Sequence, residues 1–311
     1  MRKIIGIGET ILDIIFKNEQ PRQATPGGSV FNGLVSLGRL QKAGKGDYEV
    51  CFISDVGRDR VGNLICRFME DNGISSRWVN RHPTAKTAVS LAFLDENSDA
   101  DYTFFKDYSF EGLQGEFPPI GADDLVIFGS YYALNPLLRS RMKVFLHQAR
   151  SAGALIYYDI NFRKSHTYEA DYLRTALEEN FACADIVRGS ADDFRALWNM
   201  DDPARIYREK IASLTDIMLC TAGAGGVVLQ TPDFRRGYST EKITPLSTVG
   251  AGDNFNAGIL FGLMKAGVRR EELHHLSPTQ WDAVISYAIR FSAAVCQSYD
   301  NYISLSTASS L

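Results

Sequence analysis

The most informative stretch of this sequence is Ser247-Thr-Val-Gly-Ala-Gly-Asp253-Asn-Phe-Asn-Ala-Gly258. It predicts a glycine-rich turn that runs directly into an apolar helix over about residues 252–266. The first N–H groups of a helix have no partner within it and carry the positive end of its dipole, so such a turn can bind an anion. Gly250 and Gly252 carry no Cβ, which allows a ligand to approach the backbone closely. We therefore predict an anion site here, with the Asp253 carboxylate at its mouth.

Asp253 also has a plainer possible role, because an aspartate at a helix start can simply cap it, a contribution of about 1 kcal/mol. Capping alone does not call for two glycines around a small alanine, so we favour a functional role. Two other nucleotide-binding motifs are incomplete in this sequence. The pair Gly6 and Gly8 lacks the third glycine of the dinucleotide fingerprint, and residues 33–40 lack the lysine of a P-loop.

Composition narrows the class of protein. The 311 residues contain 33 Lys and Arg against 37 Asp and Glu, a net charge of -4 with no basic stripe, so we do not expect nucleic acid as a partner. No apolar run reaches the roughly 18 to 20 residues that span a bilayer, so we expect no membrane partner. The five cysteines form no C-x-x-C pair and the histidines no H-E-x-x-H. We therefore expect neither a zinc site nor disulfides, and a reducing cytoplasm as the location.

The second half of the chain alternates between strands and helices. Its predicted strands are Leu125–Phe128, Leu155–Ile160, Ile186–Val187 and Ile217–Cys220, and its predicted helices cover 136–152, 169–180, 191–199, 252–266 and 279–297. Such alternation indicates a parallel sheet covered by helices on both faces.

The first third of the chain mixes the same pattern with a small β element. Ile4–Ile7 and Ile11–Phe16 read as strands, residues 17–26 as a loop with two prolines, and Ser29–Leu40 as a helix. The segments Thr87–Leu94 and Tyr102–Lys106 are rich in β-branched and aromatic residues and flank a polar turn, which is typical of a hairpin.

Six short motifs, in order along the chain, resemble signatures of the ribokinase-like carbohydrate kinases, the PfkB family, and most of all its fructokinase-type members. These motifs are Gly8-Glu9-Thr-Ile-Leu-Asp13, Gly27-Gly28-Ser-Val-Phe-Asn32, Val56-Gly57-Arg58-Asp59-Arg60-Val61-Gly62, Asp159-Ile-Asn161-Phe-Arg163, Thr221-Ala-Gly223-Ala-Gly-Gly226 and Ser247-Thr-Val-Gly-Ala-Gly-Asp253. The resemblance implies a single three-layer α/β domain over residues 1–311, with a mostly parallel central sheet flanked by helices. It also implies a small β-sheet lid formed by about residues 11–24 and 87–108.

The resemblance also implies a chemistry. Asp253 would be the general base that removes the proton from a sugar hydroxyl as this attacks the γ-phosphate of ATP. Gly250, Ala251 and Gly252 would form an anion hole for the phosphoryl group, a step in which positioning and electrostatics supply most of the rate. Asp193 would help to organise Mg²⁺ through water, because it keeps the carboxylate of a family motif one methylene shorter.

The remaining residues of the implied site fall into two groups. The sugar would be bound by Asp13, Gly27, Gly28, Asn32, Lys106, Asn161 and Arg163. The nucleotide would be contacted by Ser190, Thr221, Gly223, Gly226 and Gly252.

Two departures from the family pattern concern a monovalent cation. Ser247 stands where several members have an aspartate that ligates such a cation near the anion hole. The stretch Gln297-Ser-Tyr-Asp-Asn-Tyr302, in the last fifteen residues of the sequence, lacks the Gly-Ala that helps to form the same site. A hydroxyl is a poor substitute for a charged oxygen ligand, so we expect dependence on Mg²⁺ with little stimulation by K⁺.

The function implied is ATP-dependent phosphorylation of a small sugar, a fructose-like ketose or a keto-sugar acid. A nucleoside or ribose kinase of the same fold is the alternative, and a catalytically silent sugar-binding sensor is a third possibility that the intact Gly-Ala-Gly-Asp253 disfavours. We further expect a homodimer built on the lids, because their outer face would expose some of Val89, Leu91, Phe93 and Phe104.

Overall fold

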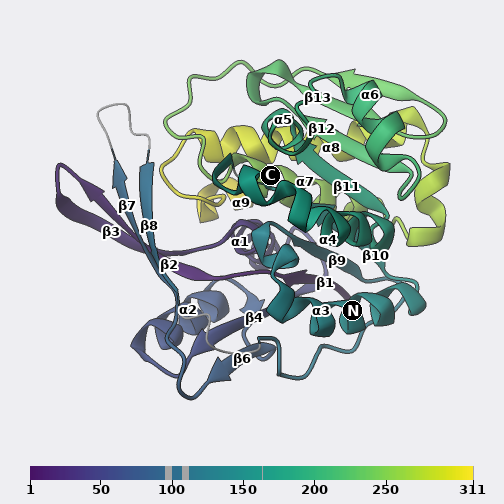
Figure 1. Cartoon of the computed structure of the whole chain (residues 1–311). Coiled ribbons are helices and arrows are strands. Elements are labelled where there is room, and N and C mark those ends of the chain that lie inside the picture. Colours follow the sequence, from purple (N-terminus) through teal and green to yellow (C-terminus); the bar gives the residue numbers. More distant parts are fainter. Residues whose placement is uncertain (95–99, 107–111, 163, 311) are drawn as a thin grey trace.

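The computed structural model describes residues 1–94, 100–106, 112–162 and 164–310. Within them, ten strands form a central sheet in the order β14-β13-β12-β11-β10-β9-β1-β4-β5, with β6 beside β4 (Figure 1). The strands are β1 (Arg2–Ile7), β4 (Tyr48–Gly57), β5 (Ile74–Ser75), β6 (Val79–His82), β9 (Leu125–Gly129), β10 (Leu155–Asp159), β11 (Ile186–Ser190), β12 (Ile217–Thr221), β13 (Val227–Gln230) and β14 (Arg235–Tyr238). The pairs β12–β13 and β13–β14 are antiparallel, and the others are parallel.

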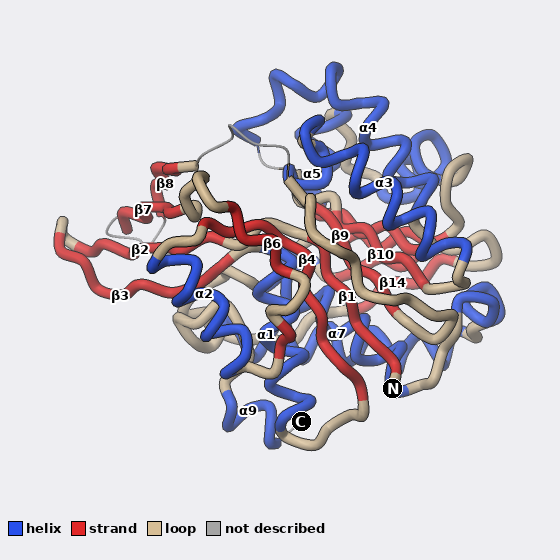
Figure 2. Tube along the Cα trace, turned by 90° about the horizontal axis from the view of Figure 1, so that it is seen from below, coloured by secondary structure: helices blue, strands red, loops and turns tan. Residues whose placement is uncertain are grey.

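Helices cover both faces of this sheet. Figure 2 shows α3 (Pro136–Ser151), α4 (Ala170–Cys183) and α5 (Ala191–Trp198) on one face, and α1 (Ser29–Lys42), α7 (Ala251–Lys265) and α9 (Leu305–Ser310) on the other. Alternate residues of a strand therefore enter different cores: Leu125 and Ile127 pack with α1 and α7, while Val126 and Phe128 pack with α3. The central strands β9, β10 and β12 are buried throughout, which explains why their sequences are almost continuously apolar.

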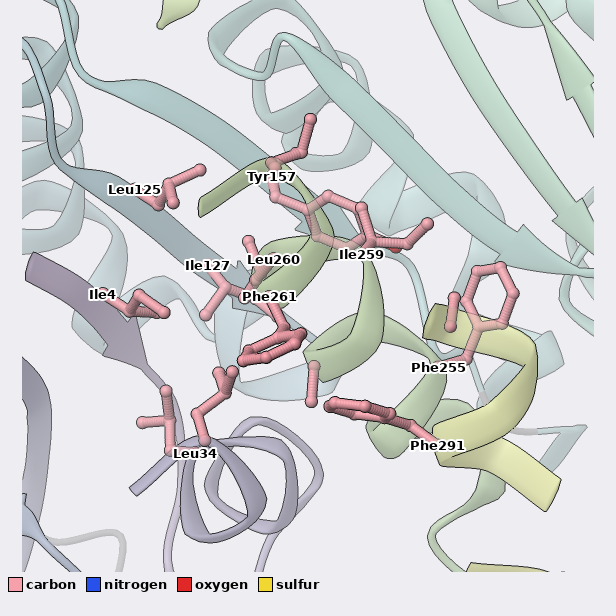
Figure 3. Close-up of a cluster of buried hydrophobic side chains, with 14 of the residues drawn as sticks. Ile4, Leu34, Leu125, Ile127, Tyr157, Phe255, Ile259, Leu260, Phe261 and Phe291 are labelled. Carbon is pink, nitrogen blue, oxygen red and sulfur yellow. The ribbon is translucent and has the colours of Figure 1, made fainter. Parts of the chain in front are cut away.

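Helix α7 is buried almost throughout its length and lies between the sheet, α1 and α8 (Pro278–Cys296). Its side chains Ile259, Leu260 and Phe261 belong to one apolar cluster with Leu34 and Phe291 (Figure 3). The backbones of α7 and α8 come close together, because a Cβ added to Gly258 would lie 2.4 Å from the Cα of Ala288. The tight packing fixes where the N-terminus of α7 lies relative to the sheet.

In the described part of the chain, four further strands form a separate sheet in the order β3-β2-β7-β8. They are β2 (Ile11–Lys17), β3 (Gln20–Gly27), β7 (Val89–Leu94) and β8 (Ala100–Phe105), and they project from one side of the molecule (Figure 1). The predicted loop over residues 17–26 was wrong, because most of it is β3. Its two prolines are tolerated because β3 is an edge strand, where a missing N–H costs no ladder hydrogen bond.

The two faces of the small sheet differ. Phe104 pairs with Ser90, and Ser90 with Asp13, so these three side chains lie on the same face. The prediction that placed Phe104 on the outer face was therefore wrong, since the side chain beside Asp13 points toward the main body. The opposite face carries Phe93 and Phe105 instead, which are 40% and 58% exposed.

The predicted α/β class, parallel sheet and hairpin strands are confirmed, and each predicted helix is present to within a few residues. The sequence analysis missed β4, α2 (Arg60–Asp71) and the β13–β14 hairpin. A short fold element, α6 (Pro203–Ile206), was missed as well. Among the described residues, none of the helices has the length and apolar character needed to cross a bilayer.

We predict that Gly258→Ala lowers the free energy of unfolding by about 1–3 kcal/mol, because the added methyl group would force the α7 and α8 backbones apart. Urea denaturation measures this loss. Gly237→Ala is the matched control, since a Cβ at that exposed position meets nothing within 4 Å. It should change stability by no more than about 0.5 kcal/mol. Equal stability of the two variants would contradict the close helix contact.

Candidate functional site

A cavity of about 700 Å³ lies at the carboxyl ends of the parallel strands, between the central sheet and the small sheet. In open α/β sheets this edge is where ligands bind. The predicted site residues that line it are Asp13, Gly28, Asn32, Lys106, Asn161, Ser190, Asp193, Gly250, Gly252 and Asp253. The predicted sugar-binding residues and the predicted anion turn therefore line the same cavity.

The anion turn has the geometry that its glycines predict. Gly250 is the N-cap of α7 and has a left-handed backbone (φ 79°), and a Cβ there would lie 2.6 Å from the carbonyl oxygen of Asn301. Asp253 is the third residue of the helix, and Gly250 at the cap offers no side chain. The alternative in which Asp253 is only the N-cap residue is therefore wrong. Its carboxylate accepts a 2.8 Å hydrogen bond from Nδ2 of Asn32.

The pair Gly27 and Gly28 joins β3 to α1. The backbone at Gly28 has φ 133°, and a Cβ there would lie 2.2 Å from the carbonyl oxygen of Glu9. Only glycine allows this approach, which brings the β1–β2 connection against the start of α1. Asp13 lies just beyond on β2, where it accepts a hydrogen bond from the Ser90 hydroxyl.

Lys106 forms an ion pair over the same cavity. Its Nζ lies 2.6 Å from Oε2 of Glu9, with the lysine side chain 15% exposed and the glutamate 32% exposed. The ammonium also lies 4.9 Å from the centre of the Phe104 ring. Glu9 lines the cavity too. The sequence analysis quoted Glu9 within a motif but gave it no role, so this partner of Lys106 was missed.

Asn161 holds a strained conformation at the end of β10. Its φ is 37°, which is uncommon for a residue with a side chain. The neighbours on both sides are tied down: Ile160 donates to the carbonyl of Arg188, and Phe162 donates a 2.6 Å hydrogen bond to Oδ1 of Asp193. Strain of this kind persists where surrounding contacts over-determine the backbone, and it is frequent at ligand sites.

Both carboxylate oxygens of Asp193 accept hydrogen bonds from other groups of the protein. Its Oδ2 accepts hydrogen bonds from the backbone N–H and the hydroxyl of Ser190, which form a capping box at the start of α5. Burial raises the pKa of this carboxyl, and the nearby Asp159 raises it further, while Arg188 acts in the opposite direction. Through these contacts Asp193 positions Ser190 and the backbone beside Asn161. Its role in organising Mg²⁺ stays a prediction. Among the described residues, no cluster of three or more His, Cys, Asp or Glu could hold a metal ion.

Arg188 is a cavity residue that the sequence analysis missed. It is 7% exposed, and its guanidinium donates to Oδ1 of Asp159 at 2.9 Å and to Oγ1 of Thr221 at 2.6 Å. A Cβ on Gly252 would lie 3.1 Å from one Nη, so the cation lies beside the anion turn. Its Nε, also buried, has no hydrogen-bond partner among the described residues. The available signal in the sequence was an arginine directly after the predicted strand Ile186–Val187, at its carboxyl end.

The cation is linked to α7 by a buried chain of hydrogen bonds. Oδ2 of Asp159 accepts from Nδ2 of Asn256 at 2.8 Å, and Oδ1 of Asn256 accepts from the Tyr157 hydroxyl at 2.8 Å. Burial by itself lowers the pKa of the Arg188 guanidinium, but the carboxylates of Asp159 and Asp193 outweigh it and raise that pKa above its ordinary value. Arg188 is therefore a permanent positive charge at this edge of the sheet.

A second wall of the cavity was also missed. Asp55, at the carboxyl end of β4, accepts hydrogen bonds from the Tyr132 hydroxyl at 3.0 Å and from Nε2 of His82 at 3.0 Å. Nearby in the lining, the rings of Tyr131 and His166 stack with centroids 3.9 Å apart. These residues come from two strands, β4 and β6, and from two short 3-10 helices at residues 131–134 and 164–169, so no local pattern in the sequence predicts that they meet.

Several predicted residues do not line the cavity. Gly27 and Ala251 adjoin lining residues along the chain, and Thr221 lies behind Arg188. Gly223 and Gly226 have positive φ values of 53° and 98° around a short 3-10 turn after β12. Arg163 lies outside the described residues.

Comparison with known proteins identifies the family to which this chain belongs. The profile of the "pfkB family carbohydrate kinase" matches residues 1–308. This chain belongs to the pfkB family. It is thus a carbohydrate kinase, a phosphotransferase with an alcohol group as acceptor, as the six motifs predicted.

Individual relatives are distant. A probable chloroplastic fructokinase-6 of Arabidopsis thaliana is 25% identical over 270 residues, which is 83% of this chain and 69% of that protein. The crystal structure of aminoimidazole riboside kinase from Salmonella enterica, complexed with aminoimidazole riboside and an ATP analogue, has a TM-score of 0.81 at 23% identity and covers 98% of this chain and 96% of the other. A fructokinase double mutant from Vibrio cholerae O395, with bound fructose, ADP and potassium, has a TM-score of 0.82 at 23% identity and covers 98% and 95%. Both structures establish the ribokinase-like fold.

We predict that Arg188→Met lowers the free energy of unfolding by about 3–5 kcal/mol, because it leaves the Asp159 carboxylate buried without its counter-charge. Urea denaturation followed by circular dichroism measures the loss. Arg195→Met is the matched control, since Arg195 pairs with Asp192 on the surface at 49% and 68% exposure. It should cost less than about 1 kcal/mol. A comparable loss in both variants would show that the buried pair has no special structural role.

Proposed function

We propose that this pfkB kinase transfers the γ-phosphoryl group of ATP to a hydroxyl of a fructose-like ketose or keto-sugar acid. The observation that carries the proposal is the 2.8 Å hydrogen bond between Asn32 and Asp253, which joins the proposed sugar-binding wall to the proposed base in one cavity. A sugar held by Asp13 and Asn32 would present its hydroxyl directly to the Asp253 carboxylate.

In this proposal Asp253 accepts the proton of the attacking hydroxyl. The oxygen then displaces ADP from the γ-phosphorus in line. The N–H groups of the turn at Gly250, Ala251 and Gly252 stabilise the charge on the transferring group, as donors aimed at a developing anion do elsewhere. We assign Arg188 to the same task, because its guanidinium is fixed beside Gly252 and its Nε still lacks a partner among the described residues.

We place the rest of the nucleotide along Ser190 and the glycine turn at Gly223 and Gly226. A second cavity of about 400 Å³ is available for its base, lined by Glu241, Arg290, Ala294, Gln297, Ser298, Ser304 and Thr307. Its lining residue Gln297 follows Cys296, whose carbonyl accepts a hydrogen bond from the N–H of Leu246, shortly before the anion turn in the chain. Mg²⁺ enters as part of the MgATP substrate, where it would neutralise phosphate charge.

Two observations bear on the choice of sugar. The likeness to fructokinases and the Lys106–Glu9 pair over the cavity favour a polar ketose or its acid. A riboside is the alternative substrate, because the Salmonella aminoimidazole riboside kinase has an equally similar fold. The stacked Tyr131 and His166 rings in the cavity wall are a surface suited to a planar group.

A phosphorylation screen with MgATP tests the proposal. It should include fructose, keto-sugar acids, ribose, nucleosides and aminoimidazole riboside, with ADP release as the signal and EDTA as the metal control. Turnover with a ketose or keto-sugar acid supports the first assignment, and turnover only with ribosides supports the second. Sugar binding in calorimetry without any ADP release would identify a silent sensor instead.

We predict that Asp253→Asn lowers kcat by about 10² to 10⁴, because an amide cannot accept the hydroxyl proton. Sugar affinity should change much less, since proton transfer matters mainly in the transition state. Asp192→Asn, an exposed acid in the first turn of α5, is the control and should keep full kcat. A variant that keeps more than about a tenth of wild-type kcat, well above the range for a lost base, would show that Asp253 is not the base.

We propose that the four-stranded sheet is a lid and that two copies pair through its outer face. Phe93 and Phe105 there are 40% and 58% exposed, and Phe16 stacks on Phe93 at 4.8 Å, so the face exposes large apolar side chains. Such surfaces tend to mark protein contacts.

We also propose a cytoplasmic location. The five cysteines are free thiols, and a reducing compartment would keep them so.

We predict a solution mass of twice the 34.6 kDa chain by light scattering at micromolar concentration. Phe105→Lys should shift the mass toward the monomer, because a charge would be buried at the contact. Tyr172→Lys, at a side chain that is 78% exposed on α4, is the control and should leave the dimer intact. A monomeric wild-type protein would exclude the pairing.

A further inference from the structure

Asn254 is a fully buried amide in the first turn of α7, directly after Asp253. Its Nδ2 donates to two carbonyl oxygens, those of Gly250 and Asn301, each at 2.8 Å. Its Oδ1 accepts a 2.5 Å hydrogen bond from the Ser36 hydroxyl. Both N–H bonds and the oxygen are thus used, and exchanging the amide nitrogen and oxygen would set an acceptor against two carbonyls.

These contacts join three distant segments at the anion turn. Gly250 lies in the turn, Asn301 in the stretch after α8, and Ser36 in the middle of α1. Ser36 in turn accepts a hydrogen bond from the N–H of Ile303 at 2.9 Å, so residues 301–303 are held on both sides of the amide. Because Gly250 and Asn301 both line the cavity, the amide fixes the backbone on which a phosphate would bind.

Three oxygens around this turn, those of Gly250, Asn301 and the Ser247 side chain, offer a monovalent cation a poor site. The carbonyl of Gly250 accepts from both the backbone N–H and the side-chain amide of Asn254, at 2.9 and 2.8 Å. The carbonyl of Asn301 faces the same amide, and the Ser247 hydroxyl oxygen accepts from the N–H of Val249 at 3.2 Å. A cation bound to these oxygens would lie against amide hydrogens that carry positive partial charge. Potassium is bound in the structure of the Vibrio cholerae fructokinase double mutant, so the response of this chain to K⁺ is a direct test.

We propose that the Asn254 amide replaces a monovalent cation in this chain: it holds the carbonyls of Gly250 and Asn301 together and so keeps the anion turn in its binding geometry. Asn254 is a positioning residue, because it touches no reacting atom and acts through the backbone of Gly250. The proposal rests on the proposed function, in which that turn binds the transferring phosphoryl group.

The first experiment compares wild-type protein in KCl, NaCl and choline chloride at fixed ionic strength. We expect kcat to differ by less than twofold among the three salts, and both the melting temperature and the calorimetric Kd for ADP to be the same in each. A several-fold activation by K⁺, or a K⁺-specific rise in melting temperature or ADP affinity, would overturn the proposal.

The second experiment compares Asn254→Ala with Ser36→Ala. Both variants remove a buried hydrogen bond of the same network and should lower the melting temperature, but only the first releases Gly250. We expect Asn254→Ala to lose at least tenfold in kcat with the sugar KM within threefold, and Ser36→Ala to keep kcat within threefold. Equal kcat losses in the two variants, or none in Asn254→Ala, would overturn the positioning role.

Asn254→Thr serves if the alanine variant does not fold, because a hydroxyl can donate to one of the two carbonyls and not to both. The same kcat loss is expected, and wild-type kcat in this variant would overturn the proposal. Failure of the proposed function is separable: it would leave the wild-type protein without ADP release on any sugar. The proposal is then judged on the affinity for a non-hydrolysable ATP analogue, which carries the γ-phosphate; Asn254→Ala should weaken it at least tenfold and Ser36→Ala should leave it unchanged.

Discussion

The buried ion pair between Asp159 and Arg188 holds the parts of this site in register. It joins the ends of β10 and β11 side by side, and Asn256 extends the same network to α7, the helix that carries Asp253. Removing two charges from water is costly unless each finds a counter-charge and further hydrogen bonds, and here both conditions are met in large part. The buried Nε of Arg188 is the one donor of its guanidinium that stays without a hydrogen-bond partner among the described residues.

The apolar packing of α7 complements this polar network. The helix is buried against the sheet, α1 and α8, so its N-terminus cannot shift without opening the largest core of the molecule (Figure 3). The buried side chains Asn254 and Asn256 interrupt that apolar surface, and each is hydrogen-bonded at both ends of its amide. Buried polar groups are tolerated when they are satisfied in this way, and they specify one arrangement among several of similar apolar burial.

The small sheet meets the site through side chains on one face only. Asp13, Ser90 and Phe104 face the cavity, whereas Phe93 and Phe105 face away. Period-two alternation makes this division unavoidable, since neighbouring residues of a strand point to opposite faces. A small element can therefore bind a ligand with one face and another protein copy with the other.

Local patterns in the sequence determined the α/β class, the anion turn at Gly250 to Asp253 and the small hairpin. Apolar periodicity and glycine spacing act over a few residues, so they can be recognised along the chain. The edge strand β3 could not be recognised, because its polar residues and prolines fit a strand only where one side is unpaired. Tertiary structure alone decided which side chains meet: Asn32 and Asp253, whose contact closes the site, are 221 residues apart. Contacts over such distances depend on how the helices pack on the sheet. The contacts of Arg188, Asp55 and Asn254 are therefore visible only in the tertiary structure.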